Sequence, residues 1–221
     1  MKILLINASP RKNGATAKVL NEFVSNLKLC GGAETTLVHL SETRLEFCKG
    51  CCACYKTGNC FIDDDADSLS RAISQADGLI IGTPCYASNV TGQLKTFIDR
   101  GHFVFEQLLK DKHVLGVVTY ENAEGGAAFK VLKKLFLFSG ARTIDKLIIK
   151  LPFNSDPLVS GNKIKSKAIS FYKKIHSNKP KNIPNTIIHS AVFNFGIKPF
   201  VKRKGELYSG VLTHWRNRGI L

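Results

Sequence analysis

The 221-residue sequence has no apolar run long enough to cross a membrane. Its first residues, Met1 to Asn7, contain too short an apolar stretch for a signal peptide, so no leader is expected. The six histidines lack the spacing of metal ligands, and we find no internal repeat or low-complexity segment. These absences favour an ordinary soluble α/β protein without histidine metal sites.

Two nucleotide-binding signatures are also missing. The sequence has no G-x-x-x-x-G-K-[ST] segment, and no two of its 18 glycines stand two residues apart. A P-loop nucleotide site and a G-x-G-x-x-G dinucleotide site are therefore both excluded.

Acidic residues are scarce in the last quarter of the chain. Residues 161–221 contain 13 Lys and Arg but one acidic residue. Residues 1–160 contain 19 Lys and Arg and 16 Asp and Glu. Aromatic residues alternate with these basic ones, but no recognised nucleic-acid module is present, so we expect no nucleic-acid partner. Two interpretations remain open. The aromatics pack on the core or a neighbouring subunit, or the lysines attract NADPH phosphates or an acidic redox protein.

Five of the seven cysteines lie in the thirteen residues 48–60. An odd, clustered set argues against a secreted disulfide framework and favours a reducing cytoplasm. Cys48, Cys51, Cys54 and Cys60 have the spacing C-x2-C-x2-C-x5-C, which suits a [4Fe–4S] cluster, with Cys52 pointing away. A packed turn without a cluster is the second interpretation. Zinc is the third, although its sites usually pair two separate short knuckles. Cys30 and Cys85 are expected to be structural.

Apolar runs alternate with amphipathic patterns along residues 1–176. Strands are predicted at Ile3–Ile6, Thr35–Leu40, Leu79–Gly82, Val114–Thr119 and Lys146–Leu151. Helical patterns are centred on Leu20–Leu27, Leu69–Ala76, Val90–Ile98 and Ala128–Phe136, and a last helix is predicted over residues 162–176. This alternation predicts a parallel, doubly wound sheet that binds ligands at the carboxyl ends of its strands. Residues 152–161 read as a linker, and an irregular tail is predicted from Lys179 onward.

The loop after the first predicted strand has the features of a phosphate site. Ser9 and Thr16 offer hydroxyl groups, Arg11 offers charge, and Asn13-Gly14 supports a turn before a helix. Backbone N–H groups at such a helix start bind anions. The alternative is a simple helix start in which Thr16 is only the N-cap.

Three segments together resemble a known family. They are Ser9-Pro-Arg-Lys-Asn-Gly-Ala-Thr16, the cysteine segment with Asp63 to Asp65, and Pro84-Cys-Tyr…Thr91…Leu94-Lys…Phe97…Asp99-Arg100. In this order they are similar to the flavodoxin-like NAD(P)H-dependent FMN reductases, and specifically to the iron–sulfur flavoproteins. The resemblance covers residues 1–150 well, and Tyr208, Trp215 and Gly219 echo the ending of that family.

The resemblance implies a five-stranded sheet in the order 2-1-3-4-5, a flavodoxin-like domain over 1–160 with a cysteine-rich insertion at 48–60, and a basic extension over 161–221. It implies FMN-phosphate contacts from the first loop: Ser9, Arg11, Asn13, Gly14, Ala15 and Thr16. It also implies ribityl and ring contacts from the second loop: Pro84, Cys85, Tyr86, Ala87, Asn89 and Val90. Thr119, Tyr120, Glu121 and Gly125 would close over the ring edge, although the family more often has glycines where Tyr120 and Glu121 stand. Lys95, Asp99 and Arg100 are expected to pair structurally on their helix.

The sequence therefore predicts an oligomeric FMN-dependent oxidoreductase, a homodimer or homotetramer. Electrons would come from NAD(P)H or a ferredoxin-like protein and go to an acceptor, directly or through the cluster. No side chain is expected to act as acid or base. The alternatives are a cluster-free quinone, nitro- or azo-compound reductase and a flavodoxin-like electron carrier without its own substrate.

Overall fold

The computed structural model describes residues 1–152, 160–178 and 183–221. Its centre is a parallel sheet of β1 (Lys2–Asn7), β2 (Glu34–His39), β3 (Gly78–Pro84), β4 (His113–Tyr120) and β5 (Thr143–Lys150). The strand order is β2-β1-β3-β4-β5, which confirms the predicted order. The register pairs Asn7 with Gly82 and Pro84 with Thr119, so the carboxyl ends of β1, β3 and β4 lie side by side.

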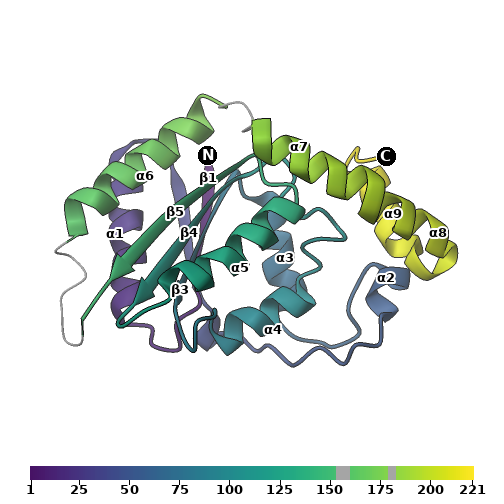
Figure 1. The fold of residues 1–221 in the computed structure, drawn as a ribbon, viewed down its shortest axis with the longest axis horizontal. Coiled ribbons are helices and arrows are strands. Elements are labelled where there is room, and N and C mark those ends of the chain that lie inside the picture. Colours follow the sequence, from purple (N-terminus) through teal and green to yellow (C-terminus); the bar gives the residue numbers. More distant parts are fainter. Residues whose placement is uncertain (153–159, 179–182) are drawn as a thin grey trace.

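Helices cover both faces of the sheet (Figure 1). One face packs on α1 (Ala15–Leu29) and α6 (Gly161–His176). The other packs on α3 (Ala66–Gln75), α4 (Gly92–Arg100) and α5 (Gly125–Phe138). Successive β1 residues alternate between the two cores, with Ile3 and Leu5 toward α1 and α6 and Leu4 and Ile6 toward the other layer. Because strand side chains alternate and both faces are covered, the strands read as continuous apolar runs.

Small elements complete the sheet domain. The 3-10 turn η1 (Leu40–Glu42) follows β2, and the short helix α2 (Ala53–Thr57) lies within the cysteine segment. The sequence pattern does not predict α2, because five residues are too few to show a helical period.

The C-terminal part is helical, so the prediction of an irregular tail is wrong. It contains α7 (Ile183–Ala191), the π-helical η3 (Val192–Ile197), α8 (Lys198–Lys204), the 3-10 turn η4 (Gly205–Tyr208) and α9 (Ser209–Asn217). Pro184 and Pro199 are the second residues of α7 and α8. Pro199 follows η3 without a break in the helical backbone, because Ile197 and Lys198 both have right-handed helical dihedrals. The predicted linker at 152–161 and the start of the predicted tail fall mainly outside the described residues.

These C-terminal helices have their own apolar cluster beside α2 (Figure 1). Trp215 is fully buried in it with Phe193, Val201 and Val211, and Trp215 Nε1 donates to the Phe105 carbonyl (2.7 Å). Across the described residues no helix is both long and apolar enough to span a bilayer.

Candidate functional site

A cavity of about 760 Å³ lies at the carboxyl ends of β1, β3 and β4. Its volume is in the range of cofactor pockets. Its walls come from the three loops that follow these strands and from Leu151 and Pro152 after β5. This is the edge of a doubly wound sheet where ligands bind.

Hydrogen bonds fold the first loop into a tight turn before α1. Asn7 Oδ1 accepts from the Ser9 amide (3.1 Å), and Ser9 Oγ accepts from the Arg11 amide (3.1 Å). The N-cap of α1 is Gly14, which has no capping side chain, and the first turn has no acidic residue. The N-terminal amides of α1 and the nearby Arg11 therefore suit an anion.

Thr16 is not the N-cap of α1, so that alternative interpretation is wrong. It lies in the first helical turn, 2% exposed, and its Oγ1 is 2.8 Å from Thr119 Oγ1. This hydroxyl pair joins the first loop to the end of β4. Gly82 permits this close packing, because a Cβ there would meet Leu20 and Thr16 of α1.

The second loop makes a tight turn beside the cavity. Tyr86 and Asn89 exchange backbone hydrogen bonds of 3.0 and 2.9 Å, and Ala87 and Ser88 between them have φ angles of 47° and 60°. Left-handed backbone at two non-glycine residues is strained, and such strain clusters at ligand sites. Tyr86 is 44% exposed at the cavity, so an aromatic face is available to a flat ring.

The third loop is held by Tyr120 and Glu124. The Tyr120 ring lies so close to Gly125 that a Cβ there would overlap it. Glu124 has a φ of 67°, and its carbonyl accepts from Cys85 Sγ (3.4 Å). The third loop is thus tied to the second.

The structure brings most of the predicted FMN residues to this cavity. Ten of them line it: Arg11, Asn13, Ala15, Pro84, Cys85, Tyr86, Ala87, Thr119, Tyr120 and Glu121. The other six belong to the same loops but do not line the cavity: Ser9, Gly14, Thr16, Asn89, Val90 and Gly125. Seven further residues line the cavity: Lys18, Ser88, Asn122, Ala123, Glu124, Leu151 and Pro152. Ser88 and Asn122 to Glu124 lie in the two loops that the sequence places at the flavin, whereas Lys18 and Leu151 lie outside the segments of predicted contacts. The helical period could have indicated Lys18, which is one turn after Gly14 on α1.

The cysteine segment forms a second, much smaller site. A cavity of about 20 Å³ is lined by five cysteines together with Arg100 and His102. The cysteines are Cys48, Cys51, Cys52, Cys54 and Cys60. Such a volume holds about one water molecule. Cys52, at a φ of 59° before α2, borders the same cavity, so the structure does not turn it away from the other four.

All seven cysteines are free thiols. Thiolate sulfur is the donor that iron–sulfur clusters require, so the donor chemistry of this site fits a cluster. Among the described residues, no three His, Cys, Asp or Glu side chains are grouped as ligands of a metal ion.

Charged groups form the inner wall of the cysteine cavity. Arg100 and Asp64 make an ion pair at 2.6 Å with side chains 1% and 0% exposed. His102 Nδ1 lies 2.7 Å from Glu106 Oε1. Burial lowers the pKa of His102, but the Cys54 sulfur and the Glu106 carboxylate outweigh it and raise the pKa to about 10. Lys95 pairs with Asp99 at 2.5 Å on α4, as predicted. Arg100 does not pair on its own helix, because its partner is Asp64, which lies before α3.

The C-terminal helices cover the outer side of this segment. Tyr55 of α2 stacks on Tyr208 with ring centroids 4.8 Å apart, and Phe105 meets Tyr55 edge-on at 4.9 Å. Ser209 Oγ donates to the Lys56 carbonyl (3.0 Å). Burial, with smaller contributions from Cys54 and Tyr208, raises the pKa of Tyr55 to about 12.

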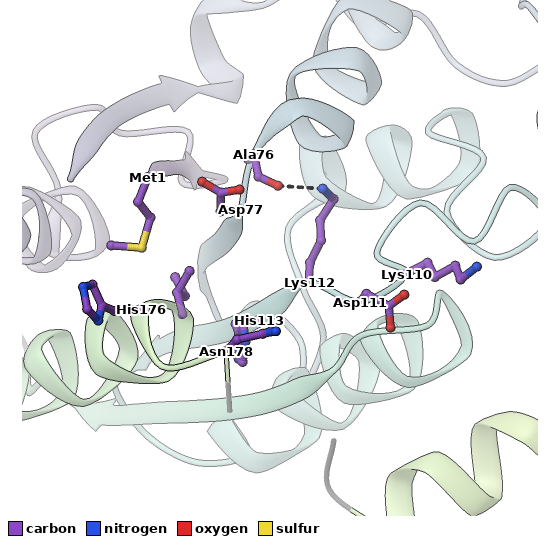
Figure 2. Close-up of a pocket in the computed structure, with 10 residues that line it drawn as sticks. Met1, Ala76, Asp77, Lys110, Asp111, Lys112, His113, His176 and Asn178 are labelled. Carbon is purple, nitrogen blue, oxygen red and sulfur yellow. Dashed lines mark hydrogen bonds between the residues drawn. The ribbon is translucent and has the colours of Figure 1, made fainter. Parts of the chain in front are cut away.

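A third cavity, of about 360 Å³, lies at the amino ends of the strands (Figure 2). It is lined by groups of both charges, among them Asp77, Asp111 and Lys112. Lys112 Nζ donates to the carbonyls of Ser74 (2.7 Å) and Ala76 (2.6 Å). This ammonium therefore links β4 to the end of α3, and we assign the cavity a structural role.

Comparison with known proteins identifies the family. Residues 1–154 match the family described as NADPH-dependent FMN reductase. An iron–sulfur flavoprotein of Clostridioides difficile (strain 630) is 37% identical over 227 residues, and one of Archaeoglobus fulgidus is 27% identical over 230 residues. Each alignment covers 100% of both chains. A solved FMN-dependent NADH-azoreductase of Bacillus anthracis str. Ames Ancestor in complex with FMN superposes with a TM-score of 0.63 at 14% identity. It covers 77% of this chain and 99% of that one.

This structural likeness confirms the flavodoxin-like fold that the sequence resemblance predicts. The family match over residues 1–154 and the full-length relatives agree on the class of chemistry. The chain belongs to the NADPH-dependent FMN reductase family and is an oxidoreductase.

Proposed function

We propose that the protein binds FMN in the cavity at the carboxyl ends of β1, β3 and β4. The observation that carries this proposal is the N-terminus of α1, which opens on the cavity without a capping side chain and with Arg11 and Lys18 beside it. An uncapped helix start with neighbouring cations is a phosphate site. The amides of Ala15 and Thr16 and the Arg11 guanidinium would hold the FMN phosphate.

The second and third loops would hold the flavin ring. Tyr86 offers an aromatic face, Pro84 fixes the chain at the end of β3, and the Tyr86–Asn89 turn presents backbone amides. FMN, when bound, supplies two-electron and one-electron redox chemistry, and the protein orients it and shields it from water. This role requires no acid or base from the chain.

We further propose that Cys48, Cys51, Cys54 and Cys60 bind a [4Fe–4S] cluster. Support comes from the gathering of these thiols around one cavity and from the relatives that are named iron–sulfur flavoproteins. Cys48 and Cys51 lie in an exposed stretch without helix or strand. Since the present cavity holds about one water, this stretch would have to move outward for a cluster to enter.

Electrons would enter from NAD(P)H, in keeping with the family description, or from a protein donor. The cluster would let them leave one at a time. The specific rival is a cluster-free quinone, nitro- or azo-compound reductase. We also propose a cytoplasmic location, because free thiols persist in a reducing compartment. The homodimer or homotetramer that the sequence resemblance implies is proposed on that resemblance alone.

Anaerobic purification followed by FMN, iron and sulfide analysis tests both proposals. We expect about one FMN per chain, about four iron and four sulfide, and a broad visible absorption beneath the flavin bands. FMN without iron, even after anaerobic reconstitution, would leave the cluster-free reductase as the function. A chain that binds no FMN would refute the assignment of the large cavity.

A further inference from the structure

The ion pair between Arg100 and Asp64 joins the two ends of the cysteine segment, at Glu46 and Asp64. We call this junction the neck of the segment. Asp64 Oδ2 accepts from Arg100 Nη1 (2.6 Å) and from the Glu46 amide (2.8 Å). Asp64 Oδ1 accepts from Arg100 Nη2 (2.8 Å) and from the Ala66 amide (3.1 Å). Arg100 Nη1 also donates to the Glu46 carbonyl (2.8 Å).

These contacts join the two ends of the segment. Glu46 lies two residues before Cys48, and Asp64 lies four residues after Cys60. Arg100 is the last residue of α4 and is 2% exposed, so the neck is anchored to a helix of the sheet domain. A bidentate, buried guanidinium–carboxylate pair holds its members in one geometry.

Three of the five N–H groups of Arg100 make these hydrogen bonds, and the N–H of Nε is not one of them. Among the described residues, its Nε is buried and has no hydrogen-bond partner. Arg100 also lines the cysteine cavity. A buried cationic N–H without an acceptor is costly, because it has lost its water.

Sulfur atoms lie at this place. Cys60 and Arg100 line the same small cavity, together with the other cysteines of the segment. Among the described residues, no sulfur yet completes a hydrogen bond with Arg100 Nε.

We propose that Arg100 is a positioning residue for the cluster: its pair with Asp64 fixes the segment so that Nε donates to the sulfur of the loaded site on the Cys60 side. This inference rests on the proposed cluster. The same N–H would stabilise the more negative, reduced form of the site, since hydrogen bonds to cluster sulfurs tune the reduction potential. Lysine cannot replace it, because a single ammonium cannot pair with Asp64 in a fork and also reach the sulfur.

The test compares wild type, Arg100→Lys and the matched control Arg71→Lys, a surface arginine of α3. Each full-length protein is reconstituted anaerobically with ferrous iron and sulfide. We measure FMN content, iron content, the rate of iron release to the chelator ferrozine, and the midpoint potential of the cluster.

We expect Arg71→Lys to behave as wild type. Arg100→Lys should keep its FMN, release iron about tenfold faster or more, and have a more negative midpoint potential. The midpoint potential of the cluster distinguishes two roles of Arg100. Donation of the Nε hydrogen to sulfur would change both the potential and the rate of iron release, whereas a merely structural role would change the rate of iron release alone.

The outcomes separate the two proposals. A wild-type protein that takes up no iron refutes the cluster itself. A loaded Arg100→Lys protein with an unchanged potential overturns the role of Arg100 and leaves the cluster intact. Loss of FMN and iron together in Arg100→Lys would also overturn it, because the arginine would then support the whole domain.

Discussion

At the scale of single residues, side-chain hydroxyls hold the three loops of the large cavity together. Thr16 Oγ1 meets Thr119 Oγ1 at 2.8 Å, and Thr91 Oγ1 donates to the Ala8 carbonyl at 2.7 Å. Thr91 also caps α4 by accepting from the Leu94 amide. These buried bonds leave the exposed Arg11 as the group of the first loop with charge to offer.

Replacing Arg11 with alanine should weaken FMN binding about tenfold, because a charge-assisted hydrogen bond to phosphate contributes about 1.5 kcal/mol or more. Titration of the apoprotein with FMN, followed by quenching of flavin fluorescence, measures the effect. Lys12→Ala is the control, since Lys12 pairs with Glu42 (2.7 Å). Equal affinities for the two variants would contradict a phosphate contact from Arg11.

His113 at the start of β4 should make stability depend on pH. It is 3% exposed, and its Nδ1 lies 2.8 Å from Thr143 Oγ1. Burial, helped by Arg142 and Lys174, lowers its pKa from 6.5 to about 4. The unfolded chain therefore binds more protons between pH 6.5 and 4, and the free energy of unfolding falls as the pH falls through this window, by about 3 kcal/mol.

Urea unfolding at several pH values measures this slope. His113→Gln should flatten the dependence of the free energy of unfolding on pH. The control is His176→Gln, because His176 is exposed and borders the same cavity at the amino ends of the strands as His113; this substitution should leave the dependence unchanged. A slope that survives His113→Gln would assign the pH dependence to other groups.

The sequence predicted the loops of the cavity better than the direction of their side chains. Spacing after the strands placed Arg11, Tyr86 and Thr119 at one sheet edge, because parallel strands bring their carboxyl ends together. It could not show that Thr16 faces Thr119, because that pairing depends on the packing of α1 against β3 at Gly82. The Arg100–Asp64 pair was not predicted either, because its partners are 36 residues apart and meet only in the folded chain.

At the scale of elements, the contact between α2 and α9 joins the cysteine segment to the C-terminal helices. It depends on two glycines, because a Cβ on Gly210 would overlap the backbone of Gly58. Gly58 itself has a φ of 83° at the end of α2. The approach brings Tyr208 onto Tyr55 and Ser209 onto Lys56.

Gly210→Ala should separate these helices and lower the free energy of unfolding by about 1–3 kcal/mol, the usual range for overpacking. Chemical unfolding measures the loss, and limited proteolysis should cut the C-terminal helices first. Gly196→Ala is the control, because a Cβ there meets no atom within 4 Å. Equal destabilisation by both substitutions would argue against a close α2–α9 contact.

The C-terminal helices show why element prediction failed there. Each is short, and proline and glycine occur at their junctions, which are signals of irregular chain in a sequence. Their stability comes from a shared cluster around the buried Trp215, which no local pattern reveals. The three central strands were predicted because each is rich in consecutive apolar residues, whereas β2 and the start of β5 contain polar residues.

At the scale of the whole molecule, the net charge is strongly positive. The net charge is +15, and exposed basic residues of α8 include Lys202, Arg203 and Lys204. Such a surface raises the encounter rate with acidic proteins, and salt screens the effect over about 10 Å at 0.1 M.

Reduction by an acidic, ferredoxin-like protein should therefore slow about tenfold between low and physiological salt. Stopped-flow kinetics over a series of salt concentrations measures it. Reoxidation by a neutral quinone is the control, because an uncharged acceptor is not steered by the field. A donor rate that is independent of salt would contradict an acidic protein as the electron source.

The buried Arg100–Asp64 neck has a consequence for the order of assembly. The sheet domain closes the ends of the cysteine segment with its own side chains, so the entropy of closing this loop is lost when the chain folds. In small zinc domains the metal must arrive before the fold exists. Here protein side chains alone make the ion pair, so we expect the proposed cluster to enter after folding and to be lost without unfolding of the sheet domain.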